Sequence, residues 1–169
     1  MAERLRWWRW ALLAVTVASL VLSIVLVRKD PNMTFYLPFT RFWELLIGSL
    51  IAVGLPPPIQ NRTARQLMSL TGLGMILYGV VTYTAQTRFP GESALLPCLG
   101  AGLILYADIT GPTLVGRMLS LKPMIWVGLI SYSLYLWHWP VLVFARYVLM
   151  RPLEPFDKLA IFAVVMLLA

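Results

Sequence analysis

The sequence has few of the residues on which common catalytic and metal sites depend. Its 169 residues include one cysteine, Cys98, and one histidine, His138. A single cysteine excludes an internal disulfide and a thiolate metal cluster, and a single histidine excludes the common multi-histidine sites. Only 12% of the residues are charged. We therefore predict no metal site and no bound cofactor.

The sequence also lacks any polar stretch long enough to form a soluble domain. Hydrophobic residues make up 60% of the chain, and the mean hydropathy is +0.79. Soluble domains do not have this composition, so we predict a membrane protein whose first partner is the lipid bilayer. The 14 basic residues are scattered among apolar runs, with no basic face or stacking motif around them. This pattern indicates loops at the lipid border and no nucleic-acid partner.

About 20 apolar residues are needed to cross the hydrocarbon core as a helix. Six runs are candidate membrane segments: residues 7–27, 39–55, 66–85, 93–107, 124–147 and 158–169. The run 93–107 contains Pro97, so we expect a kink or shielding within the bundle. The last run rises only about 18 Å as a helix, and we expect the chain to stop inside a truncated segment. The predicted fold is an all-α, polytopic transmembrane helical bundle.

Orientation is weakly determined by charge, because alternating crossings put seven basic residues on each side. Five acidic residues fall on the side opposite the N-terminus, namely Asp30, Glu44, Glu92, Glu154 and Asp157. The N-terminal side therefore carries less compensated positive charge, which favours a cytoplasmic N-terminus.

The first distinctive stretch is FYLPFTRFWELLIG, residues 35–48. It places Arg41 and Glu44 beside an apolar run, where ionisable groups are costly unless paired or wet. Arg41 is suited to hold a phosphate or carboxylate, with Glu44 orienting it. The alternative interpretation is a structural ion pair at the membrane interface, flanked by interfacial aromatic residues.

The second distinctive stretch is LISYSLYLWHWP, residues 129–140. Helical spacing places Gly128, Ser131, Tyr135 and His138 on one face. Imidazole exchanges protons near neutral pH, so His138 is suited to activate a hydroxyl or protonate a leaving group. The alternative is a hydrogen bond across the bundle that fixes helix packing.

Two further arginines, Arg88 and Arg146, are candidate contacts for an anionic sugar or lipid headgroup, although ordinary loop solvation also explains them. No Gly-x-Ser-x-Gly elbow surrounds the serines of residues 129–140, so serine hydrolase chemistry is unsupported.

Both stretches, together with the turn at residues 89–91 and the segment 119–123, resemble the acyltransferase 3 family of membrane O-acyltransferases. The resemblance extends over about residues 33–152. Within the family, the sequence most resembles the branch fused to an SGNH-type domain. The resemblance implies transfer of an acyl group, usually acetyl from acetyl-CoA, to a hydroxyl of lipopolysaccharide O-antigen, peptidoglycan or another envelope glycan. It also implies a multi-pass location in the bacterial inner membrane.

Family members have about ten membrane segments, with a proposed catalytic histidine and an arginine in the first. Such an N-terminal half is not in this sequence, so we expect the chain to be the later part of the membrane domain and inactive alone. The resemblance assigns no catalytic residue here. It gives Arg41, Glu44, Ser131, Tyr135 and His138 supporting or cavity-lining roles. The expected partners are the missing N-terminal half, the glycan acceptor and a fused or separate SGNH domain.

Two other classes of protein fit the same residues. Broken helices and buried charges are also typical of transporters and flippases. A non-catalytic membrane accessory subunit would fit a natural chain of this length.

Overall fold

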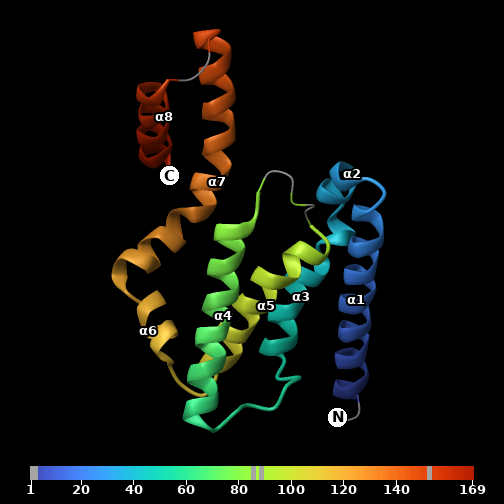
Figure 1. The fold of residues 1–169 in the computed structure, drawn as a ribbon. Coiled ribbons are helices and arrows are strands. Elements are labelled where there is room, and N and C mark those ends of the chain that lie inside the picture. Colours follow the sequence, from blue (N-terminus) through green and yellow to red (C-terminus); the bar gives the residue numbers. More distant parts are fainter. Residues whose placement is uncertain (1–3, 85–86, 88–89, 152–153) are drawn as a thin grey trace. The chain divides into compact units, whose positions relative to one another are not determined.

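The computed structural model describes residues 4–84, 87, 90–151 and 154–169. Every regular element among these residues is a helix, which confirms the predicted all-helical class (Figure 1). The chain forms two compact units, residues 1–117 and residues 118–169, and each is described by itself.

Four helices form the body of the first unit: α1 (Arg4–Val27), α3 (Phe42–Ala52), α4 (Arg62–Thr82) and α5 (Glu92–Asp108). Helix α1 is mostly apolar and contains no glycine or proline, so nothing in it breaks the helix. Between α1 and α3 lie the short α2 (Pro31–Tyr36) and the 3-10 turn η1 (Pro38–Thr40). Asp30 starts α2, because its Oδ1 accepts a hydrogen bond from the amide of Met33 at 3.0 Å.

Helices α4 and α5 lie side by side and cross where two glycines meet (Figure 1). A Cβ added to Gly72 would lie 2.4 Å from the carbonyl oxygen of Gly100. A Cβ added to Gly100 would lie 2.6 Å from the carbonyl oxygen of Gly72. Small residues allow this close approach, and in a bilayer such packing replaces the hydrophobic effect as the force between helices.

Polar contacts join the helices at the end of the first unit where α1 begins. Arg9 Nη2 donates a hydrogen bond to the carbonyl oxygen of Val53, just after α3, at 3.0 Å. Arg65 Nε of α4 donates to the carbonyl oxygen of Ala107 in α5 at 2.7 Å. Both guanidinium groups thus bind carbonyls at helix C-termini, where the helix dipole favours positive charge.

A second set of contacts lies at the opposite end of the first unit. The amide of Gly91 donates to Ser23 Oγ of α1 at 3.1 Å. Arg28 and Glu92 form an exposed ion pair with a separation of 3.4 Å. The start of α5 is therefore held against the end of α1.

The second unit contains α7 (Lys122–Leu149) and α8 (Pro155–Leu168), which pack against each other. The short α6 (Leu114–Leu119) precedes α7 in the chain. Met150 ends α7 in a left-handed conformation with φ 48°. No residue of α7 is buried. An apolar helix with this exposure is suited to contact lipid or further protein.

Within the described part of the chain, three helices are long and apolar enough to cross a membrane by length and composition: Trp7–Val27 of α1, α4 and α7. The other predicted segments contain the shorter helices α3, α5 and α8, so the count of six crossings stays a prediction. The predicted segment 39–55 starts within the 3-10 turn η1, and its α-helical part, α3, begins at Phe42. Helix α4 begins at Arg62, where the side chain of Asn61 caps it.

Candidate functional site

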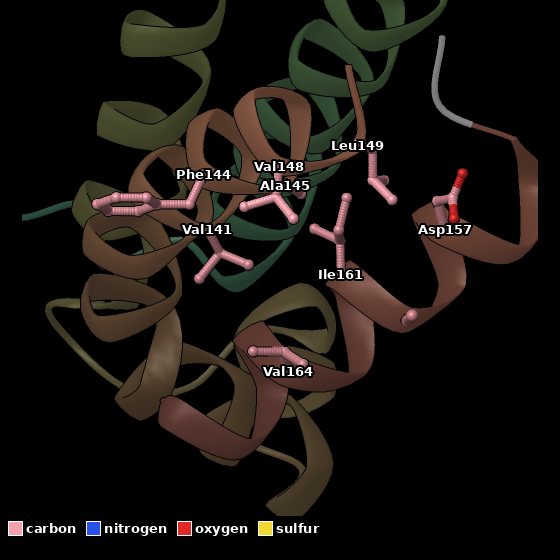
Figure 2. Close-up of a pocket in the computed structure, with 9 residues that line it drawn as sticks. Val141, Phe144, Ala145, Val148, Leu149, Asp157, Ile161 and Val164 are labelled. Atoms are coloured by element: carbon pink, nitrogen blue, oxygen red, sulfur yellow. The ribbon is translucent and has the colours of Figure 1, made fainter. Parts of the chain in front are cut away.

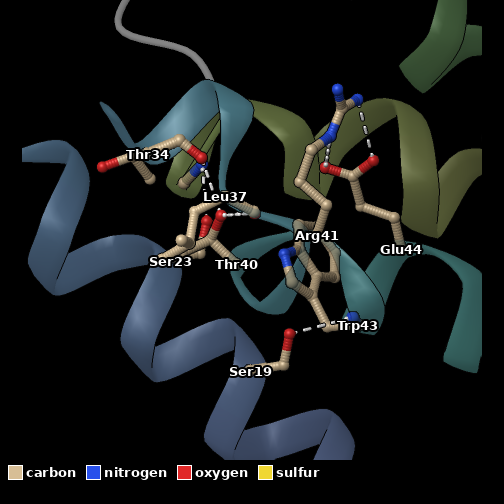
Figure 3. A network of polar contacts seen from close by, with 9 residues as sticks. Ser19, Ser23, Thr34, Leu37, Thr40, Arg41, Trp43 and Glu44 are labelled. Atoms are coloured by element: carbon tan, nitrogen blue, oxygen red, sulfur yellow. Dashed lines mark hydrogen bonds and ion pairs between the residues drawn. The ribbon is translucent and has the colours of Figure 1, made fainter. Parts of the chain in front are cut away.

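Arg41 and Glu44 form the ion pair that their spacing predicted. Arg41 Nη2 lies 3.2 Å from Glu44 Oε2, and Arg41 Nε lies 3.4 Å from Oε1 (Figure 3). The Arg41 side chain is 39% exposed and that of Glu44 is 17% exposed. The guanidinium also stacks on Phe35, with its central carbon 5.2 Å from the ring centroid. Two contacts therefore fix the direction of this partly exposed cation.

The backbone that carries this pair is held by hydroxyl groups, because the breaks around η1 leave carbonyls without helical partners. Ser19 Oγ of α1 donates to the carbonyl oxygen of Phe39 at 2.6 Å. Ser19 Oγ also accepts a hydrogen bond from the amide of Trp43 at 3.1 Å (Figure 3). Trp43, which lies between Arg41 and Glu44 in the sequence, has a fully buried side chain. Helix α1 thus positions the start of α3, and with it the ion pair.

A second hydroxyl fixes the turn that precedes Arg41. Thr40 Oγ1 lies 2.7 Å from the carbonyl oxygen of Thr34 and 2.6 Å from that of Leu37. Thr40 and Thr34 are both buried. Because a hydroxyl replaces missing backbone donors here, α2 and η1 keep a defined shape.

The polar face predicted on α7 is a continuous helical face in the second unit. Ser131 Oγ donates to the carbonyl oxygen of Gly128 at 2.7 Å. His138 Nδ1 lies 2.5 Å from the carbonyl oxygen of Tyr135, and the two rings are 5.6 Å apart. A carbonyl only accepts, so Nδ1 is the donor in this contact, and in the neutral imidazole Nε2 is then the acceptor. This bond lies within α7, and a bond from His138 across the bundle stays a prediction.

The structure therefore brings together Arg41 with Glu44, and Tyr135 with His138. The two pairs belong to different units, so a shared cavity stays a prediction. Arg146 is exposed in the last turn of α7. Arg88 lies outside the described residues. In residues 4–84, 87, 90–151 and 154–169, no group of three His, Cys, Asp or Glu side chains could hold a metal ion.

A groove of about 480 Å³ runs between α7 and α8 (Figure 2). Its lining residues are Val141, Phe144, Ala145, Val148, Leu149, Asp157, Ala160, Ile161 and Val164. The only ionisable group in that lining is Asp157, which already accepts a 2.7 Å hydrogen bond from Arg151. The groove thus offers apolar surface and no available acid or base for acyl transfer.

Asp157 forms the N-terminal cap of α8 together with Glu154. Its Oδ2 accepts from the amide of Glu154 at 2.9 Å, and Arg151 donates to both carboxylate oxygens. The backbone hydrogen bond, followed by the bonds from Arg151, lowers the pKa of Asp157 below its ordinary value of 3.8. Arg151 also lies 3.3 Å from Glu154. This cluster stabilises a helix start.

Comparison with known proteins bears on the function of these sites. All 169 residues match the acyltransferase domain of the acyltransferase 3 family. The chain belongs to this family. It is 27% identical over 161 residues, 95% of the chain, to a protein named as the membrane-bound transacylase BcsY of Komagataeibacter xylinus. It is 30% identical over 71% of the chain to the peptidoglycan O-acetyltransferase OatA of Listeria monocytogenes.

The O-acetyltransferase OatA of Staphylococcus aureus is 31% identical over 80% of the chain. The chain spans 40% of the length of BcsY, 21% of the Listeria protein and 24% of the Staphylococcus protein. No solved structure matches. Family membership, together with three helices able to cross a membrane, makes this chain part of a membrane acyltransferase family. It favours that interpretation over a transporter or an accessory subunit.

The hydroxyl groups that position the ion pair were not predicted from the sequence. A signal for them was present, because Thr16, Ser19 and Ser23 recur at helical spacing in an apolar run and are all buried. Polar residues on one face of a membrane helix indicate a face turned toward protein. The partners Phe39 and Gly91 could not be identified, because they bond through their backbones.

Proposed function

We propose that this chain forms part of a bacterial inner-membrane enzyme that transfers an acyl group to a hydroxyl of an envelope polysaccharide. Acetyl is the proposed group, and peptidoglycan or lipopolysaccharide O-antigen is the proposed acceptor class. The observation that carries the proposal is the Arg41–Glu44 pair, held partly exposed on a fixed turn in a chain of this family. The OatA relatives, named as O-acetyltransferases, support the choice of group.

Acyl transfer to a sugar hydroxyl requires removal of the hydroxyl proton and stabilisation of negative charge on the acyl oxygen. Arg41 provides a cation whose direction is fixed by Glu44 and Phe35. His138 Nε2 can accept a hydrogen bond from a hydroxyl, because its Nδ1 is bonded to Tyr135. We assign both residues a supporting role in substrate positioning. The base that takes the proton is proposed to lie elsewhere in the full polypeptide.

The donor is proposed to be acetyl-CoA or another acyl-CoA, and an SGNH domain is a proposed partner. We place the N-terminus in the cytoplasm. Near the start of α1, Arg9 and Arg65 donate to backbone carbonyls, whereas at the opposite end of the first unit Arg28 and Arg41 are paired with the carboxylates of Glu92 and Glu44. Reporter fusions after Val27 and after Ala52 test this orientation. A reporter fused after Val27 is expected to show periplasmic activity. Periplasmic activity only of the reporter fused after Ala52 would contradict the cytoplasmic N-terminus.

Deleting the gene and restoring it in variant form tests the function. Glycan O-acetylation, measured by mass spectrometry of base-released acetate, is expected to fall at least tenfold with Arg41→Ala and Glu44→Gln. Ser49→Ala is the control, because Ser49 is exposed on α3 and bonds only its own helix at Leu45. Protein level is followed by immunoblot. Wild-type acetylation in both variants, or none in the parent strain, would contradict the proposal.

A further inference from the structure

The α2–α3 edge is the name used here for four contiguous side chains: Tyr36, Phe35, Arg41 and Glu44. The rings of Tyr36 and Phe35 meet edge to face with centroids 5.3 Å apart. Phe35 in turn lies under the guanidinium of Arg41, which pairs with Glu44. Two aromatic rings and an ion pair therefore form one continuous surface.

This surface is open although its backbone is rigid. Tyr36 is 82% exposed and Phe35 is 43% exposed. Beneath them, buried Thr34 and Thr40 hold α2 and η1 through the hydrogen bond from Thr40 Oγ1. Exposed rings on a fixed backbone lose little conformational entropy when a ligand binds.

Charge and polarity indicate what this edge contacts. A partly exposed ion pair is costly in hydrocarbon, which places the edge toward water or the membrane interface rather than among acyl chains. Glu44 neutralises Arg41, so the pair does not select an anion by net charge. It instead offers N–H donors beside a carboxylate acceptor, a combination that suits neutral hydroxyl groups.

We propose that the α2–α3 edge binds the saccharide acceptor, with a neutral pyranose ring stacked on Tyr36 and its hydroxyls bonded to Arg41 and Glu44. Phe35, whose ring is nearly perpendicular to that of Tyr36 and lies under the guanidinium of Arg41, joins the two parts of the site. A pyranose has an apolar C–H face for the ring of Tyr36 and a rim of hydroxyls for the ion pair. This inference rests on the proposed function, and it adds the class of ligand and the residues that recognise it. Tyr36 determines acceptor affinity and takes no part in the chemistry.

Oligosaccharide binding to the full-length protein in nanodiscs tests this proposal. The probe is tetra-N-acetylchitotetraose, measured by isothermal titration calorimetry, with inorganic phosphate as a second probe. Tyr36→Leu is expected to weaken binding of the oligosaccharide about three- to tenfold, the effect of one aromatic contact. Trp10→Leu is the matched control, because Trp10 is also an exposed ring, near the start of α1. This control is expected to bind as the wild type does.

The proposal would be overturned if the wild type and Tyr36→Leu bound the oligosaccharide with equal affinity, or if Tyr36→Leu and Trp10→Leu lost affinity equally. Binding of phosphate without binding of the oligosaccharide would also overturn it. An oligosaccharide that fails to bind the wild type would also overturn it. Failure of the proposed function is distinguishable, because it appears as unchanged glycan acetylation in the deletion strain whatever the binding result. Monodisperse elution of Tyr36→Leu confirms folding, as expected for a side chain with 82% exposure.

Discussion

The phenol of Tyr83 donates a 2.6 Å hydrogen bond to the carbonyl oxygen of Ser93. That carbonyl lies four residues before Pro97, which has no amide hydrogen to donate within α5. A side chain that follows α4 thus supplies the donor that proline removes from α5. The ring of Tyr83 fits beside Gly79, where an added Cβ would lie 3.4 Å from it.

Replacing Tyr83 with Phe is expected to lower the free energy of unfolding by about 1 kcal/mol, because it leaves the Ser93 carbonyl unpaired. Thermal unfolding in nanodiscs measures the change. Tyr78→Phe is the control, since Tyr78 is an exposed ring of α4. In a Pro97→Ala background the restored amide should reduce the cost of Tyr83→Phe. An equal cost in both backgrounds would show that the phenol does not replace the missing donor.

Gly72→Ala is expected to destabilise the first unit by about 1–3 kcal/mol, because its new Cβ overlaps the backbone of α5. The clash is with the carbonyl oxygen of Gly100 at 2.4 Å, an atom that cannot move without the helix. Gly74→Ala is the control on the same helix, since nothing lies within 4 Å of its Cβ position. The unfolding temperature of Gly72→Ala should be lower than that of the wild type. That of Gly74→Ala should be equal to the wild-type value or higher. The reverse order would contradict the crossing point.

The cap of α8 is expected to weaken in acid. Because the pKa of Asp157 is lowered in the folded state, its contribution is complete above the ordinary value of 3.8 and is lost as pH falls through the lowered pKa. Hydrogen exchange at the amides of Glu154 and of residues 156–158, corrected for intrinsic rates, should show this loss of protection. Asp157→Asn should remove the pH dependence, and persistent dependence in that variant would assign it to another group.

Much of the candidate site was predictable, because its parts are local. The spacing of Arg41 and Glu44 predicted their pairing, and that of Ser131, Tyr135 and His138 predicted one helical face. The bonds that position the first pair were not predictable. They come from Ser19, which lies on another helix and bonds backbone atoms, so no residue type in the partner marks the contact.

The helical class and the apolar segments follow from the amino-acid sequence alone, because hydrophobicity and helical periodicity act over short distances. The position of Pro97 within an apolar run also predicted a local irregularity, a kink or shielding within the bundle. The tertiary structure decided where the carbonyl of Ser93 is bonded, where α3 begins, and which glycines touch. These outcomes depend on which helices are neighbours. A side chain is excluded at Gly72, because α5 lies against it, and there is space for one at Gly74.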